Sequence, residues 1–159
     1  MEKIASFTID HNKLKRGIYV SRQDKVGEIV LTSFDVRMKE PNREPVLGLP
    51  EIHTMEHLGA TFLRNHPEWK DRTIYFGPMG CSTGHYVIFA GALASTDVVK
   101  IFTEMFEFIA NFEGEIPGAT AIECGNYLNH NLPMAKWEAK KYLDEVLTQL
   151  QDENLNYPV

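Results

Sequence analysis

The segment His53-Thr-Met-Glu-His57 contains two histidines four residues apart. If this segment is helical, both imidazoles project from one face, one turn apart, and can bind the same ion. Glu56 then lies on the adjoining edge of that face. The order His-x-x-Glu-His is typical of inverted zincins, in which the carboxylate acts as a general base rather than as a ligand. The alternative is an ordinary helix with two partly exposed histidines and a surface glutamate.

Two imidazoles do not complete a metal site, and a soft ligand is available at Cys124. This cysteine is followed by Gly125 and lies between two predicted loops, so its backbone has room to turn. With His53 and His57 it forms a set of three protein ligands, which leaves one coordination position for water or a substrate oxygen. The sequence therefore predicts a catalytic rather than a structural metal site.

The second cysteine, Cys81, ends the Gly-rich turn Gly77-Pro-Met-Gly-Cys. A turn of this kind between two strands suits a thiol that is presented to a pocket. A plain buried cysteine and a disulfide to Cys124 are the alternatives. The disulfide is disfavoured because the chain carries only two cysteines and no sign of export to an oxidising compartment.

Three segments have the composition of strands. Residues 26–38 alternate apolar and polar side chains, which predicts a long strand with one buried face. Residues 72–76 and 83–93 are rich in aromatic and β-branched side chains. We therefore expect a strand on each side of Cys81.

Helical periodicity appears in three segments. The first covers residues 51–65, with Pro50 suited to its start, and it carries the histidine motif. In the second, Ser95 can cap a helix with the apolar stripe Val98, Phe102, Met105, Ile109 and Phe112. The third runs from about residue 133 to 151, with Asn131 as its predicted cap.

These elements do not alternate as regular βαβ units, which favours an α+β fold. We expect one domain over residues 1–159, with a largely antiparallel sheet and helices packed on one face. The histidine motif further suggests a relation to inverted-zincin-like metallohydrolase folds.

Composition excludes several classes of protein. The chain has 159 residues, 43% of them hydrophobic and 24% charged, as in ordinary globular proteins. A net charge of −6 leaves no basic face for a nucleic acid. No leader pattern and no run approaching ~18 apolar residues are present, so we expect a cytoplasmic protein without a membrane partner.

Several separated motifs, taken in order, resemble the S-ribosylhomocysteine lyase family, the autoinducer synthases. The motifs are His53-Thr-Met-Glu-His57, Pro78-Met-Gly-Cys81, Cys124-Gly125, Ser6-Phe-Thr-Ile-Asp-His11, Phe34-Asp-Val-Arg37 and Pro41-Asn42. The resemblance extends from about residue 4 to 150. It implies cleavage of the thioether of S-ribosylhomocysteine to homocysteine and dihydroxypentanedione, the precursor of a furanone quorum signal in the methyl cycle.

The resemblance also implies a cofactor and an assembly. One divalent ion per subunit is expected at His53, His57 and Cys124, namely Fe(II), with Zn(II) or Co(II) as replacements in purified protein. A homodimer with two sites at its interface is expected. Ser6, His11 and Arg37 of one subunit would then contact the sugar bound at the metal of the other.

The same resemblance assigns the proton transfers. The Cys81 thiolate would act on the earlier sugar protons, and Glu56 on the later transfers and on elimination of homocysteine. Without the resemblance, His11 and Arg37 would be read as surface groups. His66, His85 and His130 match none of the motifs, and they are expected to be surface or packing histidines.

One segment departs from the family pattern. Many members have Asp-Ile-Ser before Pro-Met-Gly-Cys, whereas this chain has Tyr75-Phe-Gly77. A tyrosine offers no carboxylate to a substrate ammonium group, so the anchoring of the homocysteine moiety is expected to differ.

Three other functions are compatible with parts of the pattern. A metallopeptidase of the inverted zincin type would use Glu56 to activate water, and it requires a downstream carboxylate ligand. A cysteine hydrolase would pair Cys81 with His85 or His130. In a non-catalytic interaction module, an ion would only tie the first helix to the Cys124 loop.

Overall fold

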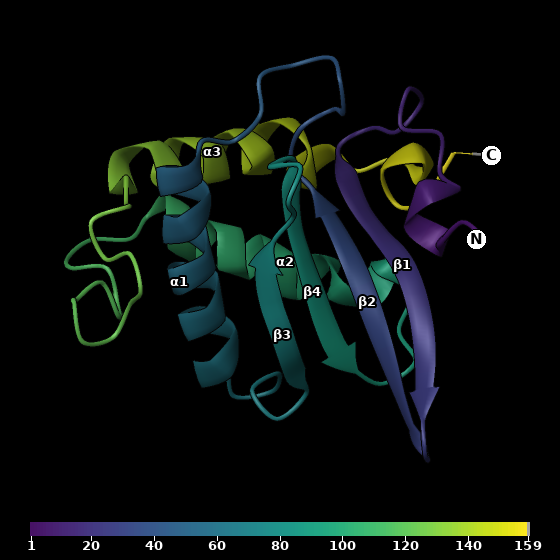
Figure 1. Cartoon of the computed structure of the whole chain (residues 1–159), viewed down its shortest axis with the longest axis horizontal. Coiled ribbons are helices and arrows are strands. Elements are labelled where there is room, and N and C mark those ends of the chain that lie inside the picture. Colours follow the sequence, from purple (N-terminus) through teal and green to yellow (C-terminus); the bar gives the residue numbers. More distant parts are fainter. Residues whose placement is uncertain (159) are drawn as a thin grey trace.

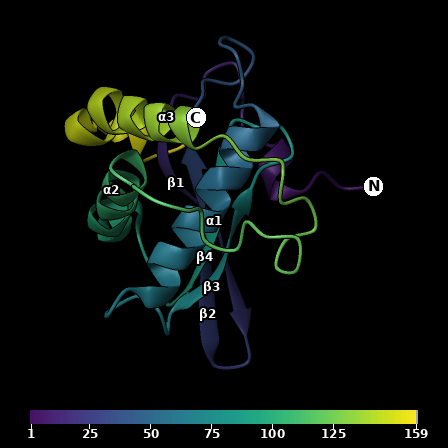
Figure 2. The same ribbon diagram turned by 90° about the vertical axis from the view of Figure 1, so that its left-hand side faces the viewer.

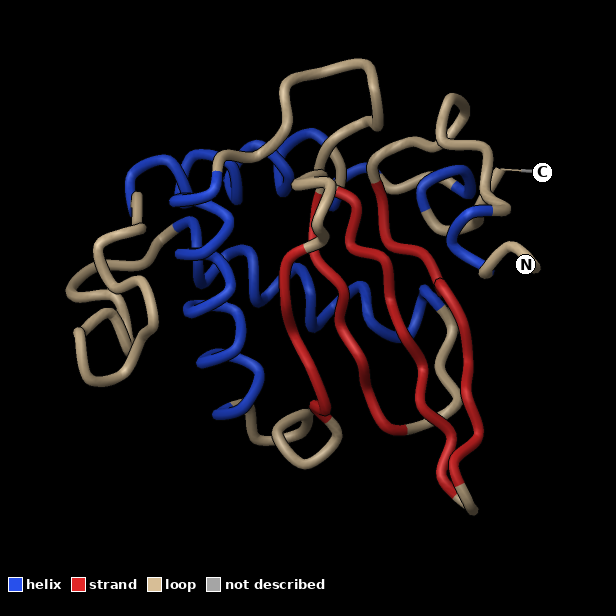
Figure 3. The backbone as a smooth tube through the Cα atoms, in the orientation of Figure 1, coloured by secondary structure: helices blue, strands red, loops and turns tan. Residues whose placement is uncertain are grey.

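The centre of the molecule is a four-stranded sheet, in a computed structural model that describes residues 1–158 (Figure 1, Figure 3). Its strands lie in the order β1-β2-β4-β3, and their bounds are Gly17–Val26 (β1), Ile29–Arg37 (β2), Thr73–Pro78 (β3) and Gly84–Ala90 (β4). All neighbouring strands are antiparallel. The predicted antiparallel sheet is confirmed.

Three α-helices pack on one face of the sheet, as predicted for an α+β fold. They are α1 (Leu49–Asn65), α2 (Ser95–Ala110) and α3 (Leu132–Glu145), with short 3-10 helices at Ala5–Phe7 (η1), Leu147–Gln149 (η2) and Asp152–Asn154 (η3). Figure 2 shows α2 and α3 together on one side of the strands, while α1 runs along the β3 edge. Within residues 1–158, no helix combines the length and the apolar character needed to cross a membrane.

The first hairpin differs from the sequence prediction. The strand predicted over residues 26–38 starts only at Ile29, because Gly27 turns the chain with a φ of 61°. Val26 is instead the last residue of β1, for which no sequence pattern was recognised. The second half of β1 is polar and largely exposed, so it lacks the buried face on which such a pattern depends.

The α1 helix starts close to where the sequence predicts. Pro50 lies in its first turn, and the Glu51 carboxylate accepts a hydrogen bond of 2.6 Å from the backbone N–H of Gly48. Burial of Met55 and Leu58 in the core holds the helix against the sheet. His53, Glu56 and His57 are only half-buried, so they belong to the other face of α1.

The ends of α2 and α3 show one wrong prediction and one correct prediction. Ser95 does not cap α2: Ala94 takes that position, and its N–H donates to the Asp97 carboxylate (2.8 Å). The Ser95 hydroxyl donates instead to the carbonyl of Leu155 (2.9 Å), an acceptor from the distant C-terminal segment. Asn131 caps α3 as predicted, by accepting from the N–H of Met134. That helix ends at residue 145, earlier than predicted, and η2 follows it.

The core lies between the sheet and the helices. The predicted α2 stripe faces this core: Val98, Phe102, Met105 and Ile109 are fully buried and Phe112 is partly buried. The ring of Phe102 contacts that of Phe34 edge-on, with centroids 6.0 Å apart. This packing fixes the helices on the sheet and gives α1 a rigid support.

Candidate metal centre

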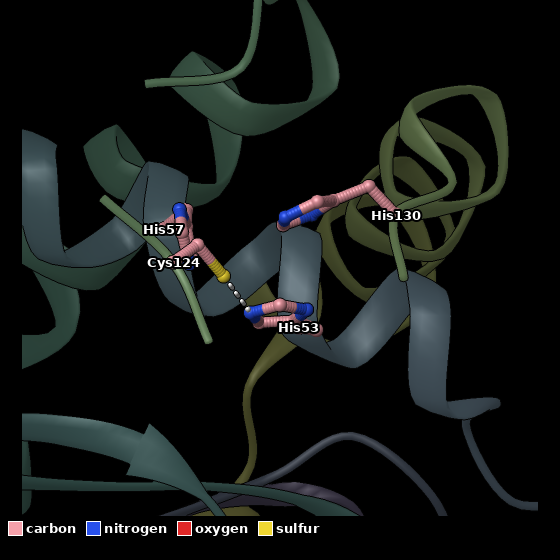
Figure 4. A group of neighbouring side chains, drawn as sticks. All are labelled: His53, His57, Cys124 and His130. Carbon is pink, nitrogen blue, oxygen red and sulfur yellow. Dashed lines mark hydrogen bonds between the residues drawn. The ribbon is translucent and has the colours of Figure 1, made fainter. Parts of the chain in front are cut away.

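The two histidines of the motif lie side by side on α1. Their ring centroids are 4.7 Å apart, and the ring planes are nearly perpendicular, at 85°. Cys124 approaches them from the long segment between α2 and α3, and its Sγ lies 3.5 Å from Nε2 of His53 (Figure 4). His130, from the end of the same segment, joins them. Ligand atoms of these four residues, the metal cluster, lie within 4.8 Å of one another.

Backbone carbonyls orient the imidazoles of the two predicted ligands. Nδ1 of His53 lies 2.8 Å from the carbonyl oxygen of Asn129, and Nδ1 of His57 lies 2.7 Å from that of Pro117. A carbonyl oxygen can only accept, so each Nδ1 carries the proton and donates it. Each neutral ring therefore keeps a lone pair on Nε2, as metal-binding histidines require.

Gly118 allows the segment to approach His57 this closely. Its φ of 70° is in the left-handed region, and a Cβ at this position would lie 3.3 Å from Nδ1 of His57. A larger residue would thus press on the ring that the Pro117 carbonyl holds. The segment between α2 and α3 is therefore part of the site, because its backbone carbonyls bond to the Nδ1 atoms of both imidazoles.

The donor set fits a divalent transition metal. Two imidazole nitrogens and a thiolate are ligands for zinc-like ions, and ordinary Zn–N and Zn–S bonds in a tetrahedron place N and S roughly 3.6 Å apart. The distance of 3.5 Å between His53 Nε2 and Cys124 Sγ matches this edge. Both cysteines are free, so the alternative of a disulfide between Cys81 and Cys124 is wrong.

His130 is the member of the metal cluster that sequence reasoning missed. Its ring stacks on that of His53, with centroids 4.1 Å apart and an angle of 21° between the planes. Its Nε2 is shielded from solvent and has no hydrogen-bond partner within residues 1–158. Desolvation, together with the nearby His53 and His57, lowers the pKa of His130. The only local sequence signal was its position shortly after Cys124.

Glu56 lies on α1 between the two motif histidines and is half-buried. In the part of the chain that the structure describes, its carboxylate has neither a hydrogen-bond partner nor an ion-pair partner. Most other half-buried carboxylates here are paired, for example Glu40 with Lys15. An unpaired carboxylate on the helix of a metal site is available to accept a proton.

Cys81 lies in the turn between β3 and β4, as predicted, and is exposed. Its Sγ contacts the Thr83 hydroxyl at 3.0 Å and Nη1 of Arg37 at 3.8 Å. Arg37 is buried, with an ion pair of 2.5 Å to Asp35 and a second hydrogen bond of 3.0 Å to the same carboxylate. We call these four residues the Arg37 cluster. The interpretation of Arg37 as an ordinary surface group is therefore wrong.

The charge of Arg37 is secured by its surroundings. Burial of the guanidinium opposes the charged form and is the largest single influence on it. The charge of Asp35 and its hydrogen bonds outweigh burial, so the pKa of Arg37 is raised above its usual value. A fixed cation therefore lies beside the Cys81 sulfur.

Comparison with known proteins identifies the family of the chain. The family model described as S-Ribosylhomocysteinase (LuxS) matches residues 4–153. The chain belongs to this family. It is 62% identical over 158 residues to the S-ribosylhomocysteine lyase of Porphyromonas gingivalis, with 99% of each chain covered. It is 60% identical to that of Phocaeicola vulgatus (99% and 98% covered) and 51% identical to that of Borrelia garinii subsp. bavariensis (99% and 100% covered). The predicted family resemblance is confirmed.

The other residues that resemble the S-ribosylhomocysteinase motifs lie together on the second face of the sheet. Ser6 and His11 line a small cavity with Arg37, Asp35 and Tyr157. The ring of His11 is half-buried, and its Nδ1 bonds to the carbonyl of Ile9 at 2.9 Å. The structure thus gathers Ser6 and His11 of the N-terminal segment with Arg37 of β2.

Tyr157 in the C-terminal segment was not interpreted from sequence. Its hydroxyl donates a hydrogen bond of 2.7 Å to the buried Asp35 carboxylate, and its ring stacks on Tyr19 with centroids 4.8 Å apart. Burial is the largest cause that raises the pKa of Tyr157, and the charge of Asp35 raises it further. The phenol therefore stays protonated and serves as a donor to the Arg37 cluster.

The segment that departs from the S-ribosylhomocysteinase pattern borders another cavity. Tyr75 is 47% exposed and lines this cavity of about 310 Å³ together with Ser6 and Tyr86. A Cβ at Gly77 would collide with the hydroxyl of Tyr75. The two departures are thus linked, because Gly77 leaves the space into which the tyrosine ring turns.

The two sets of motif residues are separated within one chain. Figure 1 shows α1 beside β3 at one edge of the sheet, whereas Asp35 and Arg37 belong to β2 and Cys81 to the turn after β3. Among the described residues, no hydrogen bond or ion pair joins the metal cluster to the Arg37 cluster. The metal cluster and the Arg37 cluster are therefore separate groups within one chain.

Proposed function

We propose that the protein is a metal-dependent lyase that cleaves the thioether of S-ribosylhomocysteine to homocysteine and dihydroxypentanedione. One observation carries the proposal: His53, His57 and Cys124 bring imidazole and thiol ligand atoms together in a chain of the S-ribosylhomocysteinase family. Relatives that are named S-ribosylhomocysteine lyase match over their whole length, which supports the carbon–sulfur lyase activity predicted from sequence.

In this proposal His53, His57 and Cys124 hold one divalent ion, Fe(II) in the native enzyme, with Zn(II) or Co(II) as working replacements. When bound, the ion supplies Lewis-acid polarisation of the carbonyl and hydroxyl oxygens of the sugar. The protein contributes two imidazoles held as the same tautomer by Asn129 and Pro117, and this fixed orientation supports metal affinity.

Glu56 and Cys81 move the protons. The carbon–sulfur bond can break by elimination only when the carbonyl is two carbons away, so the carbonyl must first migrate along the sugar. Each migration removes a proton from one carbon and returns it to its neighbour. We assign the earlier transfers to Cys81 and the later ones to Glu56, which also removes the proton whose loss expels the homocysteine thiolate. Support comes from the unpaired carboxylate of Glu56 and from the Arg37 cation beside the Cys81 sulfur.

The working enzyme is a homodimer in this proposal. Ser6, His11 and Arg37 of one copy bind the sugar held at the metal cluster of the other. Among the described residues, no hydrogen bond or ion pair joins the metal cluster to the Arg37 cluster, which supports this arrangement. Cys81 contacts Arg37, so it would act from the same copy as Arg37.

The described residues do not form the arrangements that the rival functions require. An inverted-zincin peptidase requires a carboxylate ligand, whereas the fourth member of the metal cluster is His130. A cysteine hydrolase needs a histidine beside its thiol, whereas the Cys81 sulfur contacts Thr83 and Arg37. His85 is fully buried and directs Nε2 to the carbonyl of Ile52. These observations favour the lyase.

The test uses anaerobically purified protein, divided for metal analysis and for a thiol-release assay with S-ribosylhomocysteine. We expect one metal per chain and thiol release that stops after chelation and returns when Fe(II) or Co(II) is added back. A blank without substrate corrects for the protein's own thiols. Casein cleavage, or metal-dependent folding without any thiol release, would contradict the proposal.

Substitution of Glu56 tests its proposed role. We expect Glu56→Gln to keep its metal and to lose about 10²-fold or more in turnover, as for other general bases. Glu107→Gln is the matched control, because Glu107 is an exposed glutamate on α2, a helix that contributes no residue to the metal cluster. Normal turnover of Glu56→Gln would remove Glu56 from the mechanism.

A further inference from the structure

His130 has no part in the mechanism above, yet its Nε2 is directed into the metal cluster. Figure 4 shows this nitrogen facing the space between His53, His57 and Cys124. The atom is shielded from solvent and has no hydrogen-bond partner within residues 1–158. A shielded polar atom without a partner destabilises the fold, so such an atom at a binding site indicates a missing ligand group.

The bonds around Thr54 fix the proton of His130 on the opposite nitrogen. The Thr54 hydroxyl lies 2.9 Å from the carbonyl of Pro50, to which it donates its single proton. The same oxygen accepts from the N–H of Asn131 (3.0 Å) and lies 3.0 Å from Nδ1 of His130. Since the hydroxyl has no second proton to give, Nδ1 must be the donor. In the uncharged His130 ring, the lone pair then lies on Nε2.

The orientation of His130 argues against its being a fourth metal ligand beside His53. An imidazole binds an ion through a lone pair that lies in the plane of its ring. The His53 and His130 rings are stacked at 21° with centroids 4.1 Å apart, so their lone pairs lie in two nearly parallel planes. Two such lone pairs do not converge on one ion at an ordinary bond length of about 2.1 Å. Of these two rings, His53 is the better placed to be the ligand, because the Cys124 sulfur lies 3.5 Å from its Nε2.

We propose that His130 orients the substrate: its Nε2 accepts a hydrogen bond from the hydroxyl or water that completes the coordination sphere. The inference rests on the proposed function, since it assigns the partner of that oxygen. An acceptor at this point selects a protonated oxygen, such as a sugar hydroxyl, over a carbonyl oxygen that has no proton to donate. His130 therefore favours one orientation of the sugar at the metal.

The main test replaces His130 by Phe, which keeps a flat ring against His53 and removes the acceptor. The Co(II)-loaded protein gives a readout apart from turnover, because its visible absorption reports the ligand set. We expect His130→Phe to retain one Co(II) per chain, with its thiolate absorption, and kcat/KM to fall about 10–100-fold. Loss of cobalt, as expected for His57→Ala, would show that His130 is a ligand. If kcat/KM and the cobalt spectrum with substrate both matched those of the wild type, His130 would have only a packing role.

A second measurement does not require the variant to fold. In the wild-type protein, a two-bond ¹H–¹⁵N correlation spectrum distinguishes the tautomers of each imidazole. We expect His130 to carry its proton on Nδ1 both with and without Zn(II). A proton on Nε2 would overturn the proposal. This spectrum and the cobalt spectrum do not depend on the reaction, so they remain informative even if the wild type released no thiol.

Thr54 provides a further check with a matched control. Thr54→Val removes the oxygen that holds Nδ1 of His130, and it should lower kcat/KM in the same direction as His130→Phe. Thr103→Val is the control, because the Thr103 hydroxyl likewise donates within its helix, to the carbonyl of Val99 (2.8 Å), but lies on α2. Equal kinetics for the two valine variants would contradict the role assigned to Thr54 and His130.

Discussion

The metal cluster and the Arg37 cluster differ in how their polar groups are paired. In the metal cluster, backbone carbonyls hold neutral rings so that lone pairs are left free and face one another. In the Arg37 cluster, a buried cation and a buried anion satisfy each other, with Thr83 and Tyr157 as further partners. The first cluster is complete only with an ion, and the second is complete by itself. Changes of metal should therefore affect the first cluster and leave the second intact.

The largest expected effect separates the two clusters through their cysteines. Cys124→Ala removes the sulfur that lies 3.5 Å from Nε2 of His53, so the ion loses one of three proposed ligands. We expect metal content to fall well below one per chain and thiol release to fall at least about 10³-fold, because the Lewis acid contributes several kcal/mol. Metal analysis and the thiol assay on the same sample measure both. Full metal content in this variant would reject Cys124 as a ligand.

The second prediction concerns the other cysteine. Cys81→Ala leaves the metal cluster untouched, since within residues 1–158 the hydrogen-bond partners of the Cys81 sulfur are Arg37 and Thr83. Metal content should stay at the wild-type level while turnover falls by about 10²-fold or more, as for loss of a proton-transfer group. The contrast with Cys124→Ala is the control. If Cys81→Ala also lost its metal, the two clusters would not be independent.

The same contrast explains how far the sequence could predict the site. Spacing along one helix revealed His53 and His57, because a helix converts a four-residue interval into one shared face. Cys124 had no such local rule, but soft-ligand chemistry and the family resemblance identified it. His130 and Tyr157 were missed because their contacts depend on how an irregular segment and the C-terminal segment pack. Packing of this kind leaves no periodic signal in a single sequence.

The fold shows the same division between local and distant causes. The α2 stripe and the Asn131 cap follow from local patterns, and both predictions are confirmed. The Ser95 cap was wrong because the carbonyl of Leu155, sixty positions away, takes the serine hydroxyl. The β1 strand was missed because its polar half is held by pairing with β2 rather than by burial, so its sequence shows no alternation of apolar and polar residues.

The third prediction breaks the Arg37 cluster without touching the metal cluster. Asp35→Asn keeps the shape of the side chain but leaves the buried guanidinium of Arg37 without its counter-charge. Loss of one partner of a buried pair costs about 3–5 kcal/mol in the free energy of unfolding. Urea unfolding should show this loss equally with and without bound metal.

The control for Asp35→Asn is Asp144→Asn. Asp144 pairs with Lys140 on the surface of α3 at 2.8 Å, with its side chain 56% exposed. An exposed pair of this kind contributes only about 0–1 kcal/mol. Similar losses in the two variants, or a loss from Asp35→Asn that depends on metal, would contradict the contrast between the clusters.

The last prediction concerns His85, which is buried in β4. Its ring stacks on Phe76, its Nε2 lies 3.4 Å from the carbonyl of Ile52 on α1, and its Nδ1 has no partner within residues 1–158. Burial lowers the pKa of His85 to about 4, against an ordinary value of 6.5. The unfolded chain therefore binds a proton at a higher pH than the folded protein does.

Because the unfolded state takes up this proton first, acid favours unfolding. The contribution of His85 is constant above pH 6.5, is lost as the pH falls from 6.5 to 4, and reaches about 3 kcal/mol. His85→Leu should remove this part of the pH dependence, so its unfolding free energy should fall by about 3 kcal/mol less than that of the wild type over the same range. Urea unfolding of both metal-free proteins at several pH values measures the difference, from which other histidines cancel. Parallel curves would show that His85 does not contribute to this pH dependence.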